Sequence, residues 1–346
     1  MELNFSEYLA LFFTALIAVG LLTPLVRRVA LRIEILDAPT ESHKTHKEAI
    51  PYLGGVAIII GTCLTTYLAI FFSGQGRALS LVSAVLIPAV LMGVIGLVDD
   101  IKKLSPWPRF IAQNLFGLVI AIVLIATSTL GSPTGNTLID VAITTLWIVG
   151  ITNSINFFDN VDGGASGTVA ISSLFLFFLS LQGGQYSIAA LSLVLTGATT
   201  GFLLWNRPPA RIYMGDAGAL FLGILIATLT LRFDPNPINL SASFALPILL
   251  LAVPILDTSV AVISRLRRRI SPFQGGQDHL SHRLIRAGLS KKQAVLSLWI
   301  LSALYCFIAI AISNAPYDLE IVIAAVAVVI WTLSLSLFLK TASGRS

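Results

Sequence analysis

The chain has 346 residues, of which 56% are hydrophobic and only 11% are charged, and its mean hydropathy is +0.89. A soluble globular protein does not have that much apolar surface, so the composition excludes this class and indicates an integral membrane protein. The net charge of +5 is explained by loops at a membrane surface and predicts no nucleic-acid partner. We expect one helical domain over residues 1–346.

Apolar runs long enough to cross a bilayer as helices, about 20 residues each, recur about eleven times along the chain. The predicted fold is therefore an all-α, polytopic membrane protein. The predicted spans are Tyr8–Val26, Leu53–Phe72, Leu81–Val98, Phe110–Leu130, Ile139–Phe157, Gly164–Leu181, Tyr186–Trp205, Ala217–Leu231, Ala242–Ile263, Ala294–Ser313 and Ile321–Leu339. Prolines inside these runs, such as Pro247 and Pro254, are tolerated where neighbouring helices replace the lost hydrogen bond.

Positive charges fall on one side of this arrangement. Of the 22 Lys and Arg residues, 20 lie in alternate loops and the tail, and only Arg77 and Arg232 lie in the opposite loops. By the positive-inside rule, the N-terminus is expected outside and the C-terminus in the cytoplasm of a multi-pass plasma-membrane protein. All four histidines lie in the predicted cytoplasmic loops, so this face is where we expect the chemistry.

Two adjacent carboxylates, Asp99 and Asp100, stand where the apolar run 81–98 meets a cationic loop. Adjacent carboxylates repel each other unless a cation or a proton shares the site, so the pair indicates metal binding or proton transfer. Taken alone, the pair is more simply explained as a hydrated helix end, because a carboxylate at the water interface costs little.

A second polar group follows at the end of the fifth predicted span. Asn153, Asn156, Asp159 and Asp162 are spaced by three residues and form a stripe along one side if the helix continues. Amides and carboxylates in an apolar run are costly, which favours a site or an interhelical contact.

A third carboxylate, Asp216, is predicted in the first turn of a helix, where an isolated acid is a cap or a dipole partner. The glycines beside it, Gly215 and Gly218, leave room for a ligand. A hard cation bound by oxygen and shared with a phosphate suits this position.

Two cytoplasmic loops carry further candidates. Gly54 and Gly55 follow a loop of lysines and histidines and could hold a phosphate at a helix start, although an ordinary positive-inside loop is the simpler explanation. In the last long loop, spacings of three and four place His279, His282 and Arg283 on one helical face, a cationic grip suited to a diphosphate. Zinc binding by the two histidines is a less well supported interpretation, because no nearby thiolate or third imidazole completes a site.

Together these stretches resemble the polyprenyl-phosphate N-acetylhexosamine-1-phosphate transferases, a membrane family that includes phospho-N-acetylmuramoyl-pentapeptide transferase. The resemblance runs from about Asp37 to Leu284, with its motifs in order at Asp99-Asp100, Asn153 to Gly163, Met214 to Gly218 and His279 to Arg283. It implies a magnesium-dependent phosphoglycosyltransferase of the bacterial undecaprenyl-phosphate N-acetylglucosamine-1-phosphate branch. The implied reaction moves N-acetylhexosamine 1-phosphate, first of all N-acetylglucosamine 1-phosphate, from a UDP-sugar to polyprenyl phosphate and releases UMP. This reaction opens a cell-envelope glycan pathway, such as lipopolysaccharide or teichoic acid synthesis.

The resemblance also implies a role for each site residue. Its implied catalytic residues are Asp99, Asp100 and Asp216, and its implied ligands for Mg²⁺, with Mn²⁺ as a substitute, are Asp216 and Asn156. Its implied substrate-binding residues are Lys47, Asp159, Asp162 and Asn206 for the uridine nucleotide and His279, His282 and Arg283 for the diphosphate or the sugar. The implied partners are the UDP-N-acetylhexosamine, polyprenyl phosphate and membrane lipid, and a homodimer is allowed.

Departures from the family pattern leave alternatives open. Asn160 replaces a common Gly and Arg109 a common Lys. Ser281 stands where the N-acetylglucosamine branch has an imidazole, so a catalytically silent homologue stays open. The identity of the amino sugar also stays open. The pentapeptide-transferring branch has three consecutive histidines, which this chain lacks. Direct attack and a phospho-Asp intermediate both fit the sequence. The rival from another class, an ion-coupled transporter, predicts inverted repeats and polar residues near the bilayer midplane, and we find neither.

Overall fold

The computed structural model describes residues 3–37, 50–74, 76–235, 240–272 and 276–341. The described chain is helical apart from a short antiparallel pair, β1 (Leu36–Asp37) with β2 (Ile50–Pro51). The helices are α1 (Phe5–Arg32), α2 (Gly54–Ser73), α3 (Gly76–Lys102), α4 (Pro106–Ala126), α5 (Thr137–Phe158), α6 (Gly164–Gln182), α7 (Tyr186–Asn206), α8 (Gly215–Arg232), α9 (Leu240–Leu250), α10 (Ala252–Arg267), α11 (Leu280–Arg286), α12 (Lys291–Ser313) and α13 (Tyr317–Lys340).

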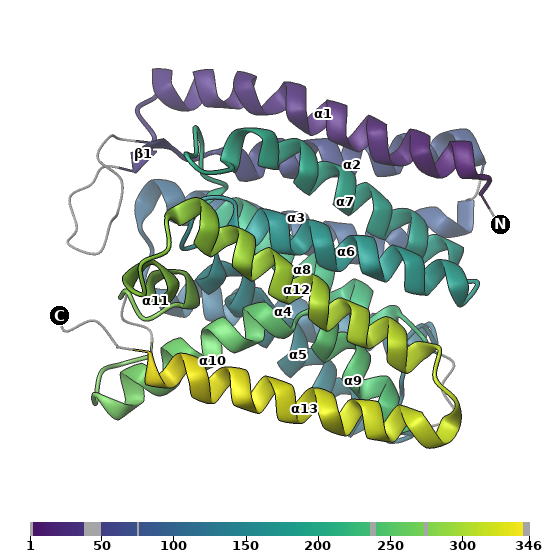
Figure 1. Cartoon of the computed structure of the whole chain (residues 1–346). Coiled ribbons are helices and arrows are strands. Elements are labelled where there is room, and N and C mark those ends of the chain that lie inside the picture. The colour runs from purple at the N-terminus through teal and green to yellow at the C-terminus, as the bar shows by residue number, and fades with distance from the viewer. Residues whose placement is uncertain (1–2, 38–49, 75, 236–239, 273–275, 342–346) are drawn as a thin grey trace.

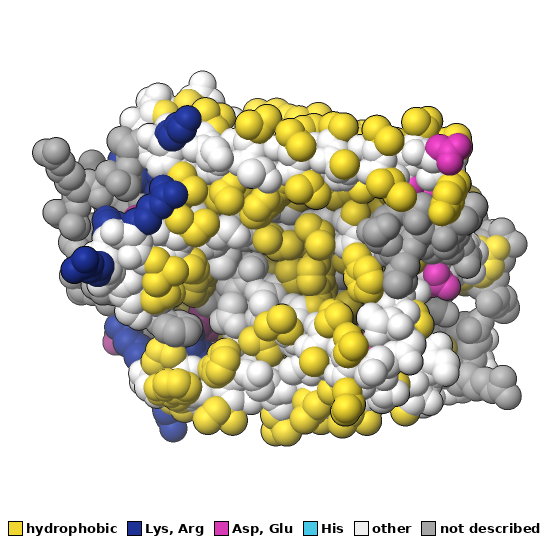
Figure 2. Space-filling model, turned by 90° about the horizontal axis from the view of Figure 1, so that it is seen from below, with side chains coloured by type: hydrophobic (Ala, Val, Ile, Leu, Met, Phe, Trp, Pro, Cys, Tyr) yellow, Lys and Arg dark blue, Asp and Glu magenta, His cyan; other side chains and the backbone are white. Residues whose placement is uncertain are grey.

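Ten of the described helices are long and apolar enough to cross a membrane, and a bent pair brings the number up to 11. The long helices lie side by side, with β1 and α11 at one end, which we call the α11 end (Figure 1). Hydrophobic side chains spread over the middle of the visible face, whereas Lys and Arg gather at the α11 end (Figure 2). The prediction of a polytopic all-α membrane protein is confirmed, and the orientation of its termini stays a prediction.

Helix α8 forms the centre of the bundle. In its most hydrophobic 18-residue stretch, 78% of the residues are buried inside the protein, compared with 6% in the corresponding stretch of α13 at the edge. A helix that is apolar on all sides is stable only when other helices surround it. Gly96 permits close packing of α3 on α8, because a Cβ atom there would lie 2.4 Å from the backbone oxygen of Asp216. The packing of α3 on α8 therefore places the end of α3 beside the first turn of α8.

The ninth predicted span, Ala242–Ile263, is not one straight helix. Segments Phe244–Leu250 and Ala252–Arg267 meet at 77°. Pro254 has no N–H to bond the carbonyl of Leu250 four residues earlier, which frees that carbonyl. The Ser172 hydroxyl on α6 donates to it at 2.6 Å. The ninth predicted span is thus present as a bent pair of helices, and a hydrogen bond from a neighbouring helix stabilises the bend.

Replacing Ser172 with Ala should remove the hydroxyl hydrogen bond to the Leu250 carbonyl at the bend and leave only the weak contact of the Cys306 thiol at 3.8 Å. We expect a loss of roughly 0.5–1.5 kcal/mol in the free energy of unfolding, the net contribution of one hydrogen bond. The thermal unfolding temperature in detergent measures the change. The matched control is Ser297→Ala, which removes an exposed hydroxyl that bonds only the Gln293 carbonyl of its own helix. Equal unfolding temperatures for the two variants would contradict the explanation of the bend.

Candidate active site

Carboxylates from distant parts of the chain meet at the junction of α3 and α8. Asp99 lies in the last turn of α3 and Asp216 in the first turn of α8. Arg109, at the start of α4, contacts both, because its Nη1 donates to Oδ2 of Asp99 at 2.5 Å and also to Oδ2 of Asp216. The backbone N–H of Leu104 donates to the other Asp99 oxygen at 2.6 Å. Arg109 was not among the predicted site residues, and the only signal for it was its position as a cation close after the Asp-Asp pair.

Asp100 fastens the start of α8 to the end of α3. Its Oδ1 accepts the N–H of Asp216 at 2.9 Å and its Oδ2 accepts the N–H of Ala217 at 3.1 Å. A carboxylate is favourable at this place, because the first amides of a helix have no partner within the helix. Gly215 has φ +67, and a Cβ atom on it would lie 2.5 Å from the Asp100 carboxylate. Asp100 therefore has a positioning task, and its predicted catalytic role stays a prediction.

Helix α5 contributes amides to the same place. The Nδ2 of Asn156 donates to Oδ1 of Asp216 at 2.7 Å, so Asn156 lies next to the carboxylate with which it was predicted to share a metal ion. One turn earlier, Nδ2 of Asn153 donates to Oε1 of Gln113 on α4 at 2.7 Å. Asn153 is thus an interhelical contact, and Asn156 belongs to the group around Asp216.

The predicted stripe along α5 holds only for its two asparagines. The helix ends at Phe158, Asp159 is its C-cap, and Asp162 lies beyond it in a turn. Asp159 nevertheless stays close to the other acids. Desolvation, followed by the carboxylates of Asp216, Asp100 and Asp162, raises the pKa of Asp159 well above its ordinary value. Asp159 is therefore a desolvated carboxyl group with the carboxylates of Asp216, Asp100 and Asp162 near it.

Asp162 and Asn206 brace the loop that leads into α8. Asp162 accepts the N–H of Ala210 at 3.0 Å, and Tyr213 donates its hydroxyl to the same side chain at 3.4 Å. Asn206 is 1% exposed, and it accepts the N–H of Gly163 and donates to the Ile212 carbonyl, each at 3.0 Å. These contacts argue against a direct contact between Asn206 and uridine. The predicted contact of Asp162 with the uridine nucleotide stays a prediction.

Two predicted ligand contacts lie in or just before the start of α2: the pair Gly54 and Gly55, and Lys47. The N–H groups of Gly54 and Gly55 donate to the carbonyls of Tyr213 and Met214 at 3.0 and 2.9 Å, so they hold the loop before α8. Their use as a phosphate cradle is thereby contradicted. Lys47 lies outside the described residues, and its predicted contact with the nucleotide stays a prediction.

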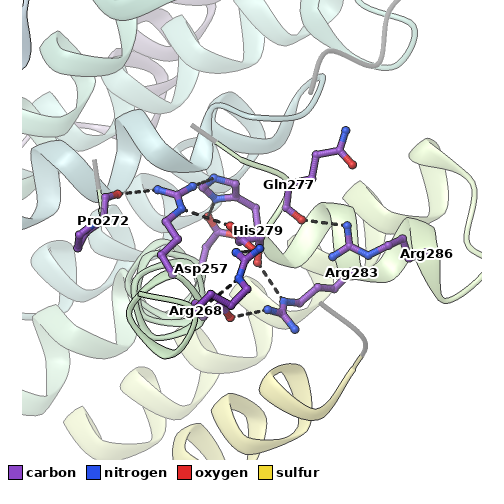
Figure 3. Close-up of polar contacts among 10 residues, drawn as sticks. Asp257, Arg268, Pro272, Gln277, His279, Arg283 and Arg286 are labelled. Carbon is purple, nitrogen blue, oxygen red and sulfur yellow. Dashed lines mark hydrogen bonds and ion pairs between the residues drawn. The ribbon is translucent and has the colours of Figure 1, made fainter. Parts of the chain in front are cut away.

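A second polar cluster joins α10 to α11 (Figure 3). The buried carboxylate of Asp257 is 2.7 Å from Nδ1 of His279 and accepts the N–H of Leu280 at 2.7 Å. The Nη2 of Arg265 is 3.3 Å from Nε2 of His279. Because a guanidinium only donates, Nε2 accepts and the proton lies on Nδ1. His279 is buried with both nitrogens engaged, so the contacts argue against the predicted grip on a diphosphate.

Arg283 faces the protein interior. Its side chain is 1% exposed, and it donates to the Asp278 carbonyl at 3.0 Å and to the Ser264 hydroxyl at 2.6 Å. Its Nη1 also donates to the carbonyls of Phe338 and Thr341 at the end of α13, at 2.7 and 2.6 Å. These contacts argue against the predicted contact of Arg283 with the diphosphate or the sugar, which stays a prediction. Arg283 instead joins α11 to α10 and α13.

His282 and Ser281 lie in α11 beside His279. The Nδ1 of His282 is buried and has no hydrogen-bond partner among the described residues. Desolvation, followed by the neighbouring His279, lowers the pKa of His282 to about 4, so the ring is neutral at pH 7. Ser281 donates to Oδ1 of Asn160 at 2.5 Å, which links α11 to the turn after α5. Two of the three departures from the family pattern, Ser281 and Asn160, therefore contact each other.

The residues around Asp216 fit a hard divalent cation. Within the described part of the chain, no three His, Cys, Asp or Glu side chains are arranged as a ligand set. Mg²⁺ does not require one, because it is commonly held by one or two carboxylates together with waters and substrate phosphates. Asp216, Asp99 and Asn156 supply carboxylate and amide oxygens. The cationic Nη1 of Arg109 already lies between the two carboxylates and marks a place where positive charge is stabilised.

Comparison with known proteins agrees with this arrangement. The model of glycosyl transferase family 4 matches residues 82–234, which include Asp99, Asn156, Asp162 and Asp216. A Bacillus subtilis (strain 168) protein, the probable undecaprenyl-phosphate N-acetylglucosaminyl 1-phosphate transferase, is 33% identical over 92% of this chain and 88% of its own length.

Two further relatives cover most of the chain. The decaprenyl-phosphate N-acetylglucosaminephosphotransferase of Mycolicibacterium smegmatis is 31% identical over 85% of this chain and 79% of its own length. The phospho-N-acetylmuramoyl-pentapeptide-transferase of Streptococcus uberis is 28% identical over 76% of this chain and 83% of its own length. The chain therefore belongs to glycosyl transferase family 4, as a member of the polyprenyl-phosphate N-acetylhexosamine-1-phosphate transferases.

Proposed function

We propose that this chain transfers N-acetylglucosamine 1-phosphate from UDP-N-acetylglucosamine to undecaprenyl phosphate and releases UMP, with its active site at the cytoplasmic face. Two relatives named for N-acetylglucosamine phosphate transfer, at 33% and 31% identity, support this sugar. The observation that carries the proposal is the contact of one Arg109 nitrogen with both Asp99 and Asp216. It brings three helices to one point where a phosphate and a cation can meet. An ion-coupled transporter receives no comparable support.

In the proposed reaction, an oxygen of the lipid phosphate attacks the sugar-bearing phosphorus of the UDP-sugar. A new P–O bond forms there, the anhydride bond breaks, and UMP leaves with the bridging oxygen and its electron pair. A phosphate monoester is already largely dianionic near neutral pH, so positioning contributes more than deprotonation. Both Asp99 oxygens accept hydrogen bonds, which favours an orienting role over attack by Asp99 itself. We therefore favour direct attack over a phospho-Asp intermediate.

Negative charge on the reacting phosphates has to be balanced by groups at the same place. Asp216 and Asn156 would hold Mg²⁺, with Asp99 close by. When bound, the ion supplies electrostatic stabilisation of the charge that develops on the phosphoryl oxygens. Arg109, which contacts Asp99 and Asp216, would provide a fixed positive charge at the same place. Asp100 and Asn156 hold the Asp216 backbone and side chain, which limits its reorganisation during the reaction.

The neutral ring of His282 suits a hydrogen bond to the sugar or the diphosphate. Its buried Nδ1 has no described protein partner, and an unsatisfied buried polar atom is costly unless a ligand or water completes it. Ser281 and Asn160 keep α11 beside the turn that carries Asp159. Among the three residues predicted to grip this part of the substrate, His282 alone stays in the proposed site.

Asp216→Asn and Asp99→Asn should each lower the turnover number by at least about 100-fold, since both remove charge at the reacting phosphates. UMP release from UDP-N-acetylglucosamine and undecaprenyl phosphate, followed with purified protein, measures the effect. Asp318→Asn, which changes an exposed acid in the first turn of α13, serves as the control and should retain activity. Full activity of the Asp216 variant would reject the proposed site. A panel of UDP-sugars in the same assay tests the choice of N-acetylglucosamine.

Removal of divalent cations should abolish UMP release, and Mg²⁺ or Mn²⁺ should restore it. Because Asp216 is the proposed ligand, Asp216→Asn should raise the Mg²⁺ concentration needed for half-maximal residual activity, whereas Asp318→Asn should leave it unchanged. A titration of UMP release with Mg²⁺ after treatment with a chelator gives both values. Undiminished activity in the chelator alone would contradict the metal assignment.

The buried His282 also predicts a pH dependence of stability. Its pKa is about 4 in the folded protein and near 6.5 for an ordinary histidine, so the unfolded chain binds the proton more tightly. The wild-type protein should therefore lose stability as the pH falls from about 6.5 to about 4. The His282→Asn variant has no histidine to protonate at this position, so it should lose less stability than the wild type over this pH range. Thermal unfolding in detergent across this range tests the difference, and identical pH profiles would contradict the burial of a neutral His282.

A further inference from the structure

A separate cavity lies at the α11 end, between the end of α7 and the start of α12. Its volume is about 530 Å³. The residues that line it include Leu204, Trp205, Arg207, Arg211, Lys292 and Trp299. None of them belongs to the predicted site, and none is used in the proposed reaction.

Three cations converge on this cavity from two parts of the chain. Arg207 and Arg211 follow α7, and Lys292 lies in the first turn of α12. Within the described residues, no carboxylate forms an ion pair with any of the three. Like charges around one hollow repel each other, so an anion in the cavity would relieve an unfavourable arrangement. This charge pattern selects an anionic ligand.

The cavity also lies at a membrane boundary. Leu204 and Trp205 belong to the last turn of one candidate membrane span, and Lys292 and Trp299 belong to the first turns of another. Leu204 is 50% exposed on the same turn, so the cavity borders the apolar surface of the bundle. Trp is typical of membrane–water interfaces, because its ring is apolar and its N–H is polar.

We propose that this cavity binds the phosphate headgroup of an anionic membrane lipid. The cations face the phosphate, and the acyl chains continue along the exposed surface beside Leu204. The positive-inside tendency explains the presence of Lys and Arg at this end. It does not explain why three of them surround one hollow together with two indoles.

The cavity is coupled to the active site through one glycine. The Nε1 of Trp299 donates to the Gly163 carbonyl at 3.1 Å, and the Gly163 N–H bonds Asn206 at 3.0 Å. A Cβ atom on Gly163 would lie 3.4 Å from both the Trp299 ring and the Arg207 Cα. The cavity wall and the turn that follows Asp159 therefore share Gly163. A lipid in the cavity stabilises that turn without touching the reacting groups.

Native mass spectrometry of the whole chain in a neutral detergent tests the proposal, with dioleoylphosphatidylglycerol as the probe and dioleoylphosphatidylcholine as the neutral reference. The test variant is Arg207→Gln with Arg211→Gln. The matched control, Arg267→Gln with Arg269→Gln, removes two exposed arginines at the same end of the bundle. We expect the first phosphatidylglycerol to bind the wild type and the control equally. It should bind the test variant roughly tenfold more weakly, because charge-assisted contacts are lost.

Equal binding by the test variant and the control would overturn the proposal. Displacement of the lipid by inorganic phosphate, with phosphate retained in its place, would also overturn it and identify a free-anion site. If the double variant does not fold, Lys292→Gln removes one exposed cation on a different helix and should weaken the first lipid about threefold. Unchanged binding in Lys292→Gln would then reject the site. Because the readout is lipid binding, its failure is distinguishable from failure of the proposed transferase reaction.

Discussion

The structure depends on balancing several carboxylates at the end of an apolar helical bundle. Asp99, Asp100 and Asp216 are brought together because Gly96 lets α3 pack directly on α8. The first amides of α8 neutralise part of this charge at Asp100, and Arg109 neutralises part at the other two. Burial, followed by the neighbouring carboxylates, raises the pKa of Asp159 beside this group.

The polar residues of the site divide into two groups with different tasks. Asp100, Asp162 and Asn206 use their polar atoms to hold helix ends and loops in place. Asp216, at the start of the central helix, keeps its carboxylate half-buried and directed at its neighbours. Since the bracing residues are mostly buried, the reacting groups are supported on a rigid frame, and this is the arrangement that catalysis by positioning requires.

Much of this fold could be predicted from composition and periodicity, because hydrophobic runs of membrane length have few alternatives. Ten of the spans appear as separate helices. The bend within Ala242–Ile263 could not be predicted, since the prolines alone do not reveal that Ser172 from another helix bonds the freed carbonyl. The packing of distant segments decides whether a proline only distorts a helix or divides it.

Only part of the candidate site could be predicted, because the remaining contacts also depend on how distant segments pack. The carboxylates that the sequence placed at one face do meet at α3 and α8, but their partner Arg109 could be recognised only in three dimensions. For His279 and Arg283, helical spacing identified neighbouring positions without identifying what those side chains face. Asp257 and Arg265 engage His279, and the end of α13 engages Arg283. Spacing along a helix is a local property, whereas these contacts depend on the placement of α10 and α13.

The most direct measurement is the location of a bound metal ion in a crystal grown with Mn²⁺ and UDP-N-acetylglucosamine, using the anomalous scattering of manganese. The account predicts a single strong peak at the junction of α3 and α8, within coordination distance of an Asp216 carboxylate oxygen and beside the diphosphate. A diphosphate bound without manganese at this junction, or a manganese ion held elsewhere by other residues, would contradict it.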